Sequence, residues 1–274
     1  MTVFQAIILG IVQGITEFLP ISSSGHLVIL PFFLNWQLPA KETFIFNVLV
    51  QIGTLVAVIF YFRKDLTAII VDFFKQLLAK TPFATHDARM GWLLIVATIP
   101  AGLAGLFFAD VVEEAFSSPL IAGIGLLVTA GLMILAEKIS QNIGDTQDIT
   151  LLSALSMGLM QVLAMFPGIS RSGSTISGGM YRHLRREAAG KFSFLMSIPI
   201  MLAAGGLSTY QMLTEVPNLG EFLPIMAIGF LTAMVVGYIA IRWLLKFLVR
   251  NSLIYFSIYC LFLGGITILV WVVK

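Results

Sequence analysis

The chain has 274 residues, of which 58% are hydrophobic and only 11% are charged. Soluble domains are about 45–50% apolar and about 25% charged, so a water-soluble fold could not bury this much apolar surface. The net charge is +2 and there is no long basic tract, so we expect no nucleic-acid partner. The single Cys260 excludes a disulfide framework and a cysteine-based metal site. The composition therefore predicts an all-α integral membrane protein.

The apolar segments are of two kinds. In chain order they are an interrupted segment (3–34), three continuous ones (43–62, 92–109 and 119–136), a second interrupted segment (151–180), and three more continuous ones (192–208, 222–241 and 253–273). A membrane-spanning helix needs roughly 20 apolar residues, so we expect six transmembrane helices from the continuous segments. Clusters of Pro, Gly and Ser break the other two, and irregular backbone survives at membrane depth only when it is buried or lines a wet cavity. We therefore expect two re-entrant helical hairpins, in a single membrane domain of residues 1–274.

Basic residues lie in alternate connections. Residues 63–91, 181–191 and 242–250 are rich in Lys and Arg, whereas the connections around Glu113 and Glu215 are acidic. Because positive charge concentrates in cytoplasmic loops, the basic connections are expected inside and both termini outside. The connection 137–150, also expected inside, has only one basic residue. In this orientation the first hairpin enters from the outer face and the second from the cytoplasm.

The two hairpins are related in sequence at an offset of 148 residues. Without gaps, the offset matches Gly10 with Gly158, Gln13 with Gln161, Phe18 with Phe166, and Ile21, Ser22, Ser24 and Gly25 with Ile169, Ser170, Ser172 and Gly173. Three spans separate the hairpins, and an odd number of spans inverts the second copy. We therefore expect an inverted-topology repeat, as in many transporters, with copies of approximately 1–136 and 149–274. The alternative is that these small residues only allow helices to pack closely.

Three titratable residues fall inside the interrupted apolar segments: Glu17, His26 and Arg171. A charge at the bilayer centre costs roughly 2.5–3.5 kcal/mol on insertion scales, so a shared site is the best explanation of all three. The alternative is a buried Glu17–Arg171 ion pair that only fixes packing, although a buried pair is weak evidence for stability.

The residues around these charges suit a phosphate. Arg171 offers a planar fork of donors, and each Ser–Gly cluster is expected to begin a helix whose positive end favours an anion. A carboxylate and an imidazole beside such a cradle are parts of a phosphoryl-transfer site. The candidate catalytic residues are Glu17, Ser23, His26 and Arg171, and the candidate phosphate-binding residues are Ser22, Ser24, Ser170, Arg171, Ser172 and Thr175.

A divalent cation, Mg²⁺ or Ca²⁺, is expected at Glu17. Gln13 precedes Glu17 by four residues, so on a helix both side chains lie on one face and Gln13 could add a neutral oxygen. Mg²⁺ is commonly held by one or two carboxylates together with substrate phosphates and waters. A diphosphate substrate would therefore supply the oxygens that the chain lacks.

The chain resembles the undecaprenyl-diphosphatase family, the bacitracin-resistance phosphatases of bacterial inner membranes, over nearly its full length. The resemblance rests on two motifs: Gln13-Gly-Ile-Thr-Glu17-Phe-Leu-Pro-Ile-Ser22-Ser23-Ser24-Gly25-His26 and Pro167-Gly168-Ile169-Ser170-Arg171-Ser172-Gly173-Ser174-Thr175. It implies a cation-dependent hydrolase that removes the terminal phosphate of undecaprenyl diphosphate at the outer face and recycles this lipid for cell-wall synthesis. Family members often have Glu where this chain has Gln13, so Glu17 is left as the only strong acid.

By position in these motifs, Glu17 and Gln13 would hold the metal or manage protons, and Arg171 would clamp the phosphate. Either Ser23 or His26 would be the nucleophile, with the other as its partner. The runner-up function is a transporter or lipid flippase in which Glu17 and His26 relay protons. A structural scaffold does not explain a buried Arg171. The expected partners are the lipid substrate and membrane lipid, and a homodimer is compatible with the sequence.

Overall fold

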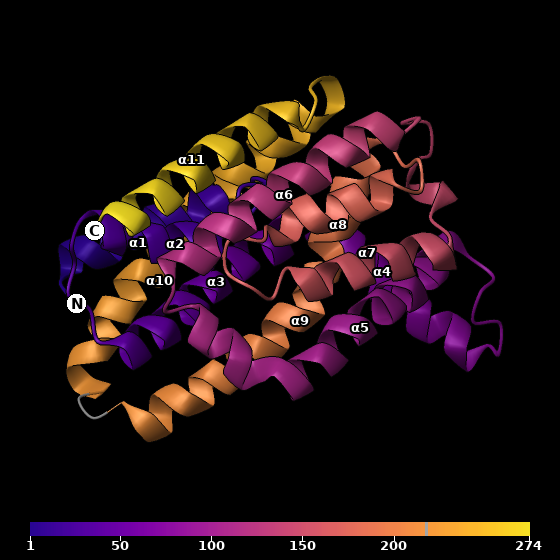
Figure 1. Cartoon of the computed structure of the whole chain (residues 1–274). Helices are drawn as coiled ribbons and strands as arrows, with labels where there is room; N and C mark the ends of the chain where they lie inside the picture. Colours follow the sequence, from indigo (N-terminus) through magenta and orange to yellow (C-terminus); the bar gives the residue numbers. More distant parts are fainter. Residues whose placement is uncertain (217–218) are drawn as a thin grey trace.

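The computed structural model describes residues 1–216 and 219–274, and within these ranges the chain is all helical. The first half contains α1 (Val3–Thr16), α2 (Ser23–Phe33), α3 (Ala40–Tyr61), α4 (Arg63–Leu78), α5 (His86–Ala115) and α6 (Pro119–Ile139). The 3₁₀ turn η1 (Thr146–Asp148) precedes α7 (Leu151–Leu163), α8 (Arg171–Met180), α9 (Arg186–Glu215), α10 (Leu219–Arg250) and α11 (Ile254–Val273). The described residues form no strand, and a single bridge joins Gly144 to Leu184. The helices make an elongated bundle with both termini at one end and α4 at the other (Figure 1).

Six helices of the described chain are long and apolar enough to cross a membrane: α3, α5, α6, α9, α10 and α11. They contain the six continuous apolar segments of the sequence to within a residue at the ends. The prediction of an all-α protein with six membrane-spanning helices is therefore confirmed by length and composition.

Each interrupted segment consists of two short helices joined by an irregular loop. The helices α1, α2, α7 and α8 have 14, 11, 13 and 10 residues, too few to cross a hydrocarbon core of about 30 Å at 1.5 Å per residue. The loops between them hold the Pro, Gly and Ser clusters. In both loops a serine starts the second helix: the hydroxyl of Ser22 accepts from the N–H of Gly25, and that of Ser170 accepts from Gly173.

The connection 63–91 contains a helix, α4, that the sequence analysis did not predict. Its many charged residues made this stretch look like a polar loop. The apolar residues nevertheless recur at helical spacing, and Ile70, Val71 and Phe74 stay exposed on one side of α4 while Ile69 is buried. Such an amphipathic helix suits the membrane surface rather than its interior.

Close helix contacts at glycines hold the short helices against the long ones. The helix α1 packs against α10, and α7 packs against α5. A Cβ added at Gly10 would lie 2.7 Å from the carbonyl oxygen of Gly229, and one at Gly158 would lie 2.4 Å from that of Ala97. Neither site has room for a side chain, as expected for helix packing through small residues.

Candidate active site

The loops before α2 and α8 meet inside the bundle. A Cβ on Gly25, in the first turn of α2, would lie 2.9 Å from the Cα of Gly168 in the second loop, so the start of α2 packs closely against that loop. Gly168 has a φ of 87°, in the left-handed region that favours glycine, and a Cβ there would strike the carbonyl oxygen of Ala122 at 2.0 Å. Ser22 has a φ of 67°, a costly conformation for a residue with a side chain. The chain thus holds both helix starts close together in fixed, partly strained geometry.

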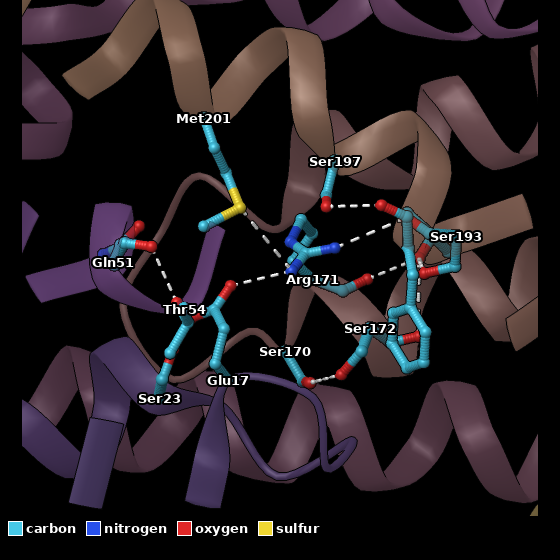
Figure 2. A network of polar contacts seen from close by, with 12 residues as sticks. Glu17, Ser23, Gln51, Thr54, Ser170, Arg171, Ser172, Ser193, Ser197 and Met201 are labelled. Carbon is cyan, nitrogen blue, oxygen red and sulfur yellow. Dashed lines mark hydrogen bonds and ion pairs between the residues drawn. The ribbon is translucent and has the colours of Figure 1, made fainter. Parts of the chain in front are cut away.

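Glu17 and Arg171 form an ion pair across this junction. Nη2 of Arg171 donates to Oε1 of Glu17 at 2.7 Å, and the two side chains are 13% and 5% exposed (Figure 2). Glu17 follows α1 directly and Arg171 is the first residue of α8, so residues 154 apart in the sequence are neighbours. The structure thus brings together Glu17 and Arg171, two of the three titratable residues expected at one site, in the ion pair that was the alternative interpretation.

The second oxygen of Glu17 accepts two more hydrogen bonds. The hydroxyl of Ser23 donates to Oε2 at 2.6 Å, and Nε2 of Gln13 donates to the same atom at 2.8 Å. Nε2 of Gln13 also lies 3.3 Å from the hydroxyl oxygen of Thr54 on α3. Ser23 is therefore in direct contact with a carboxylate that can accept its proton.

Further contacts fix the guanidinium of Arg171 and the start of α8. Nη1 donates to the carbonyl of Ser193 at 3.4 Å, and Nη2 lies 4.0 Å from the sulfur of Met201 (Figure 2). The backbone N–H of Ser170 donates to the hydroxyl of Thr129 at 2.8 Å, which ties the loop to α6. Helices α6 and α9 thus hold Arg171 in place from two sides.

A cavity of about 240 Å³, here called the central cavity, opens between these loops. Six of the predicted site residues line it: Glu17, Ser22, Ser23, Ser24, Ser170 and Arg171. Most of the rest of its wall is apolar and comes from α3, α5, α9 and the segment that follows α7, including Phe44, Val48, Val112, Phe116, Met165 and Ile200, while the amides of Gln51 and Gln161 also line it. The cavity is therefore lined both by polar groups, namely hydroxyls, a guanidinium and a carboxylate, and by an apolar surface.

The structure places four other predicted residues outside the lining of the central cavity. Gln13 sits behind Glu17. Ser172 is buried and donates to the carbonyl of Leu19 at 3.1 Å, and Thr175 is buried against the hydroxyl of Ser193 at 2.6 Å. These two hydroxyls join the loops and helices to each other.

The fourth is His26, and the structure does not join it to Ser23. Its Nδ1 lies 2.7 Å from the carbonyl oxygen of Ser22 and its Nε2 lies 2.7 Å from the hydroxyl of Tyr259, whose ring stacks on the imidazole. Because the Ser22 carbonyl only accepts, Nδ1 carries the proton and Nε2 accepts from Tyr259. Both ring nitrogens are occupied by these two contacts.

The donor set for a cation is small. Within the described ranges no group of three or more His, Cys, Asp or Glu side chains could hold a metal ion. Both oxygens of Glu17 already accept hydrogen bonds, but Oε1 of Gln13 is buried and has no partner. One carboxylate and one free amide oxygen fit a hard divalent cation only if the substrate adds oxygens of its own.

Sequence reasoning passed over several residues that lie at the site. Thr54 and Ser193 are isolated polar residues in apolar spans, and nothing in their spacing marks them. Gln161 lines the central cavity, and its equivalence to Gln13 at the 148-residue offset could have predicted it as a site residue.

Comparison with known proteins then gives the relationship. Residues 6–266 match the family described as bacitracin resistance protein BacA. The chain belongs to this family. A relative from Alkaliphilus metalliredigens, named undecaprenyl-diphosphatase, is 43% identical over 98% of this chain and 98% of its own length. Proteins of the same name from Chlorobium phaeobacteroides and Methanosphaera stadtmanae are 41% and 40% identical, over 96% and 99% of this chain and 95% and 99% of their own lengths.

Proposed function

We infer that this protein is an undecaprenyl-diphosphatase, a membrane hydrolase that removes the terminal phosphate of undecaprenyl diphosphate. Its full-length relatives carry that name. The observation that carries the inference in this chain is the hydrogen bond from Ser23 to Glu17, in one cavity with Arg171. A nucleophile, an acceptor for its proton and a phosphate-binding cation are the parts that phosphate hydrolysis needs. A transporter would need only the positively charged arginine that binds the phosphate.

In the proposed reaction Ser23 is the nucleophile. Its Oγ attacks the terminal phosphorus while Glu17 takes the hydroxyl proton. The bond from that phosphorus to the bridging oxygen breaks, and undecaprenyl phosphate leaves. Glu17 gives its proton to the leaving phosphate oxygen. A water molecule then attacks the phosphoserine while Glu17 takes a proton from it, the bond from phosphorus to Oγ breaks, and Glu17 returns the proton to Oγ, releasing inorganic phosphate and restoring Ser23.

Arg171 is the proposed phosphate clamp. It is paired with Glu17 here, so a diphosphate would compete with the carboxylate for the guanidinium. Moving the guanidinium onto the phosphate would free Glu17 to accept the proton of Ser23. The N-terminal ends of α2 and α8, which begin beside the cavity, add positive potential there.

The apolar wall of the central cavity supports a lipid substrate. A prenyl chain attached to the diphosphate needs an apolar surface next to the charged groups, and Phe44, Val48 and Phe116 provide one. His26 has a supporting role in this proposal: through its bond to the Ser22 carbonyl it holds the strained turn that presents Ser23.

A divalent cation, Mg²⁺ or Ca²⁺, is part of the proposal. Glu17 and the free oxygen of Gln13 would hold it together with phosphate oxygens. When bound, it would neutralise phosphate charge and favour attack on phosphorus.

We further propose that the two halves, approximately 1–136 and 149–274, form an inverted repeat with re-entrant hairpins, and that the site opens to the outer face of a bacterial inner membrane. Two observations support the repeat. The serine caps match, and the contact of α1 with α10 corresponds to the contact of α7 with α5. The basic connections support the orientation.

The test is phosphate release from a C55 prenyl diphosphate by the purified protein, with and without EDTA. The expected result is release that EDTA abolishes and that added Mg²⁺ or Ca²⁺ restores. No release under any of these conditions would contradict the phosphatase, whereas full release in EDTA would contradict the cation alone. Movement of an intact diphosphate lipid across vesicles without hydrolysis would favour the transporter instead.

A further inference from the structure

Gln161 on α7 is a buried amide without a hydrogen-bond partner. Its side chain is 3% exposed and it lines the central cavity, the same cavity that Glu17, Ser23 and Arg171 line. Both polar atoms, Nε2 and Oε1, are buried and neither is bonded to any group of the described chain. A buried amide that makes no hydrogen bond costs free energy, so the position calls for a partner that the chain itself does not provide.

The 148-residue offset explains why this amide is free. Gln13 is the equivalent residue of the first half, and its Nε2 donates to Glu17 and approaches Thr54. At the positions equivalent to Glu17 and Thr54, the second half has Met165 and Leu202. A thioether and an aliphatic side chain replace the two acceptors, so Gln161 keeps the burial of Gln13 without its partners.

We propose that Gln161 is a substrate-binding residue, whose Nε2 donates a hydrogen bond to a phosphoryl oxygen of the bound diphosphate. This rests on the proposed function of the site. Diphosphate oxygens only accept hydrogen bonds, so Nε2 is the atom of the amide that bonds to them. The first half of the chain thus uses its glutamine to hold the carboxylate, and the second half leaves its glutamine for the ligand.

The experiment replaces Gln161 with Met. Methionine has a similar volume, and the chain already has a methionine one turn later, at Met165. Hydrogen bonds to charged groups are the stronger ones, so Gln161→Met should lower kcat/KM about 10- to 100-fold, chiefly by raising KM. The Kd of a non-hydrolysable prenyl methylenediphosphonate, measured by calorimetry, should rise by a similar factor. The Tm of the ligand-free protein should stay the same or rise, because the variant loses an unpaired buried amide.

Ser177 offers a matched control. Its hydroxyl is also fully buried and unpartnered, but it does not line the central cavity. Ser177→Ala should leave Tm unchanged or higher and leave kcat/KM and the diphosphonate Kd at their wild-type values. A second variant, Gln161→Glu, places a negative charge beside the phosphate and should weaken diphosphonate binding further than Gln161→Met.

Two results would overturn the role of Gln161. Either kcat/KM and the diphosphonate Kd stay within about twofold of wild type in Gln161→Met, or the Tm falls while binding to the remaining folded protein is unchanged, which would mark a structural residue. Both are distinct from failure of the proposed function, in which wild-type protein itself neither hydrolyses the prenyl diphosphate nor binds its diphosphonate analogue.

Discussion

The loop before α2 and the loop before α8 can be compared position by position at the 148-residue offset. In each, a serine caps the helix, through contacts of 3.2 Å from Gly25 to Ser22 and 3.1 Å from Gly173 to Ser170. In each, that hydroxyl also lies 3.2 Å from the hydroxyl two residues later. The local backbone chemistry that starts a short helix inside the bundle is therefore the same in both.

The two loops differ where the chemistry lies. The first has Glu17 and Ser23; the second has Met165 and Arg171 at the equivalent positions. An acid with its hydroxyl partner thus comes from one half, and the cation comes from the other. Two loops that share the residues shaping the turn can therefore build one site with opposite charges because they differ at a few other positions.

The strongest test of these different roles of the two loops is to remove the hydroxyl of Ser23. If Ser23 is the nucleophile, Ser23→Ala should lose about 10⁴-fold or more in kcat, since removing a nucleophile typically has the largest effect in such sites. In wild-type protein, a denaturing quench at neutral pH during turnover should trap phosphoserine at Ser23, which survives later acid treatment and is detected by mass spectrometry. An acid-labile phosphate found on His26 instead would reverse the assignment.

The acid of the first loop is the next test. Glu17→Gln should lower kcat about 10²- to 10⁴-fold, because an amide cannot accept the proton of Ser23. The Glu137–Arg186 pair is a matched control, with side chains 9% and 21% exposed and no part in the central cavity. Glu137→Gln should lower Tm, since it also weakens a partly buried pair, and should leave kcat per folded molecule unchanged. Equal losses of kcat in both variants would mean that Glu17 acts only through stability.

The smallest expected effect in this loop is at His26. Because the imidazole contacts Ser22 and Tyr259 rather than Ser23, His26→Gln should lower kcat about tenfold or less. Tyr259→Phe removes the outer of the two contacts and should have a weaker effect still. The measurement is phosphate release by both variants at saturating substrate. A loss at His26 as large as that at Ser23 would return the imidazole to the reaction itself.

Much of this architecture can be predicted from the sequence because a helix that crosses a lipid bilayer must be long and apolar. Continuous apolar segments predict the six long helices, and the serine and glycine clusters predict where the short helices begin. Glu17 and Arg171 could be joined because two isolated opposite charges in apolar segments are costly unless they meet. The helix α4, in contrast, was not predicted, because its many charged residues interrupt the apolar residues that form one face at helical spacing.

The contacts of individual side chains were not predictable. A spacing of three residues put His26 within reach of Ser23 if only α2 is considered, yet the partner of His26 comes from α11, 233 residues later. The free amide of Gln161 likewise depends on side chains that lack an acceptor, Met165 in the loop after α7 and Leu202 on α9. Sequence spacing describes neighbours on one helix, whereas the contact of His26 with Tyr259 is made between helices.

The central claim is that one site is built from both halves of the chain, and Arg171 tests it most directly. Phosphate release from a C55 prenyl diphosphate should fall at least about 10²- to 10³-fold in Arg171→Ala, the typical cost of losing a preorganised charge donor. Arg171→Lys keeps a cation near Glu17, which guards against misfolding, but should recover only part of the rate because an ammonium lacks the planar fork. Rates within a few-fold of wild type in folded samples of both variants would contradict the claim.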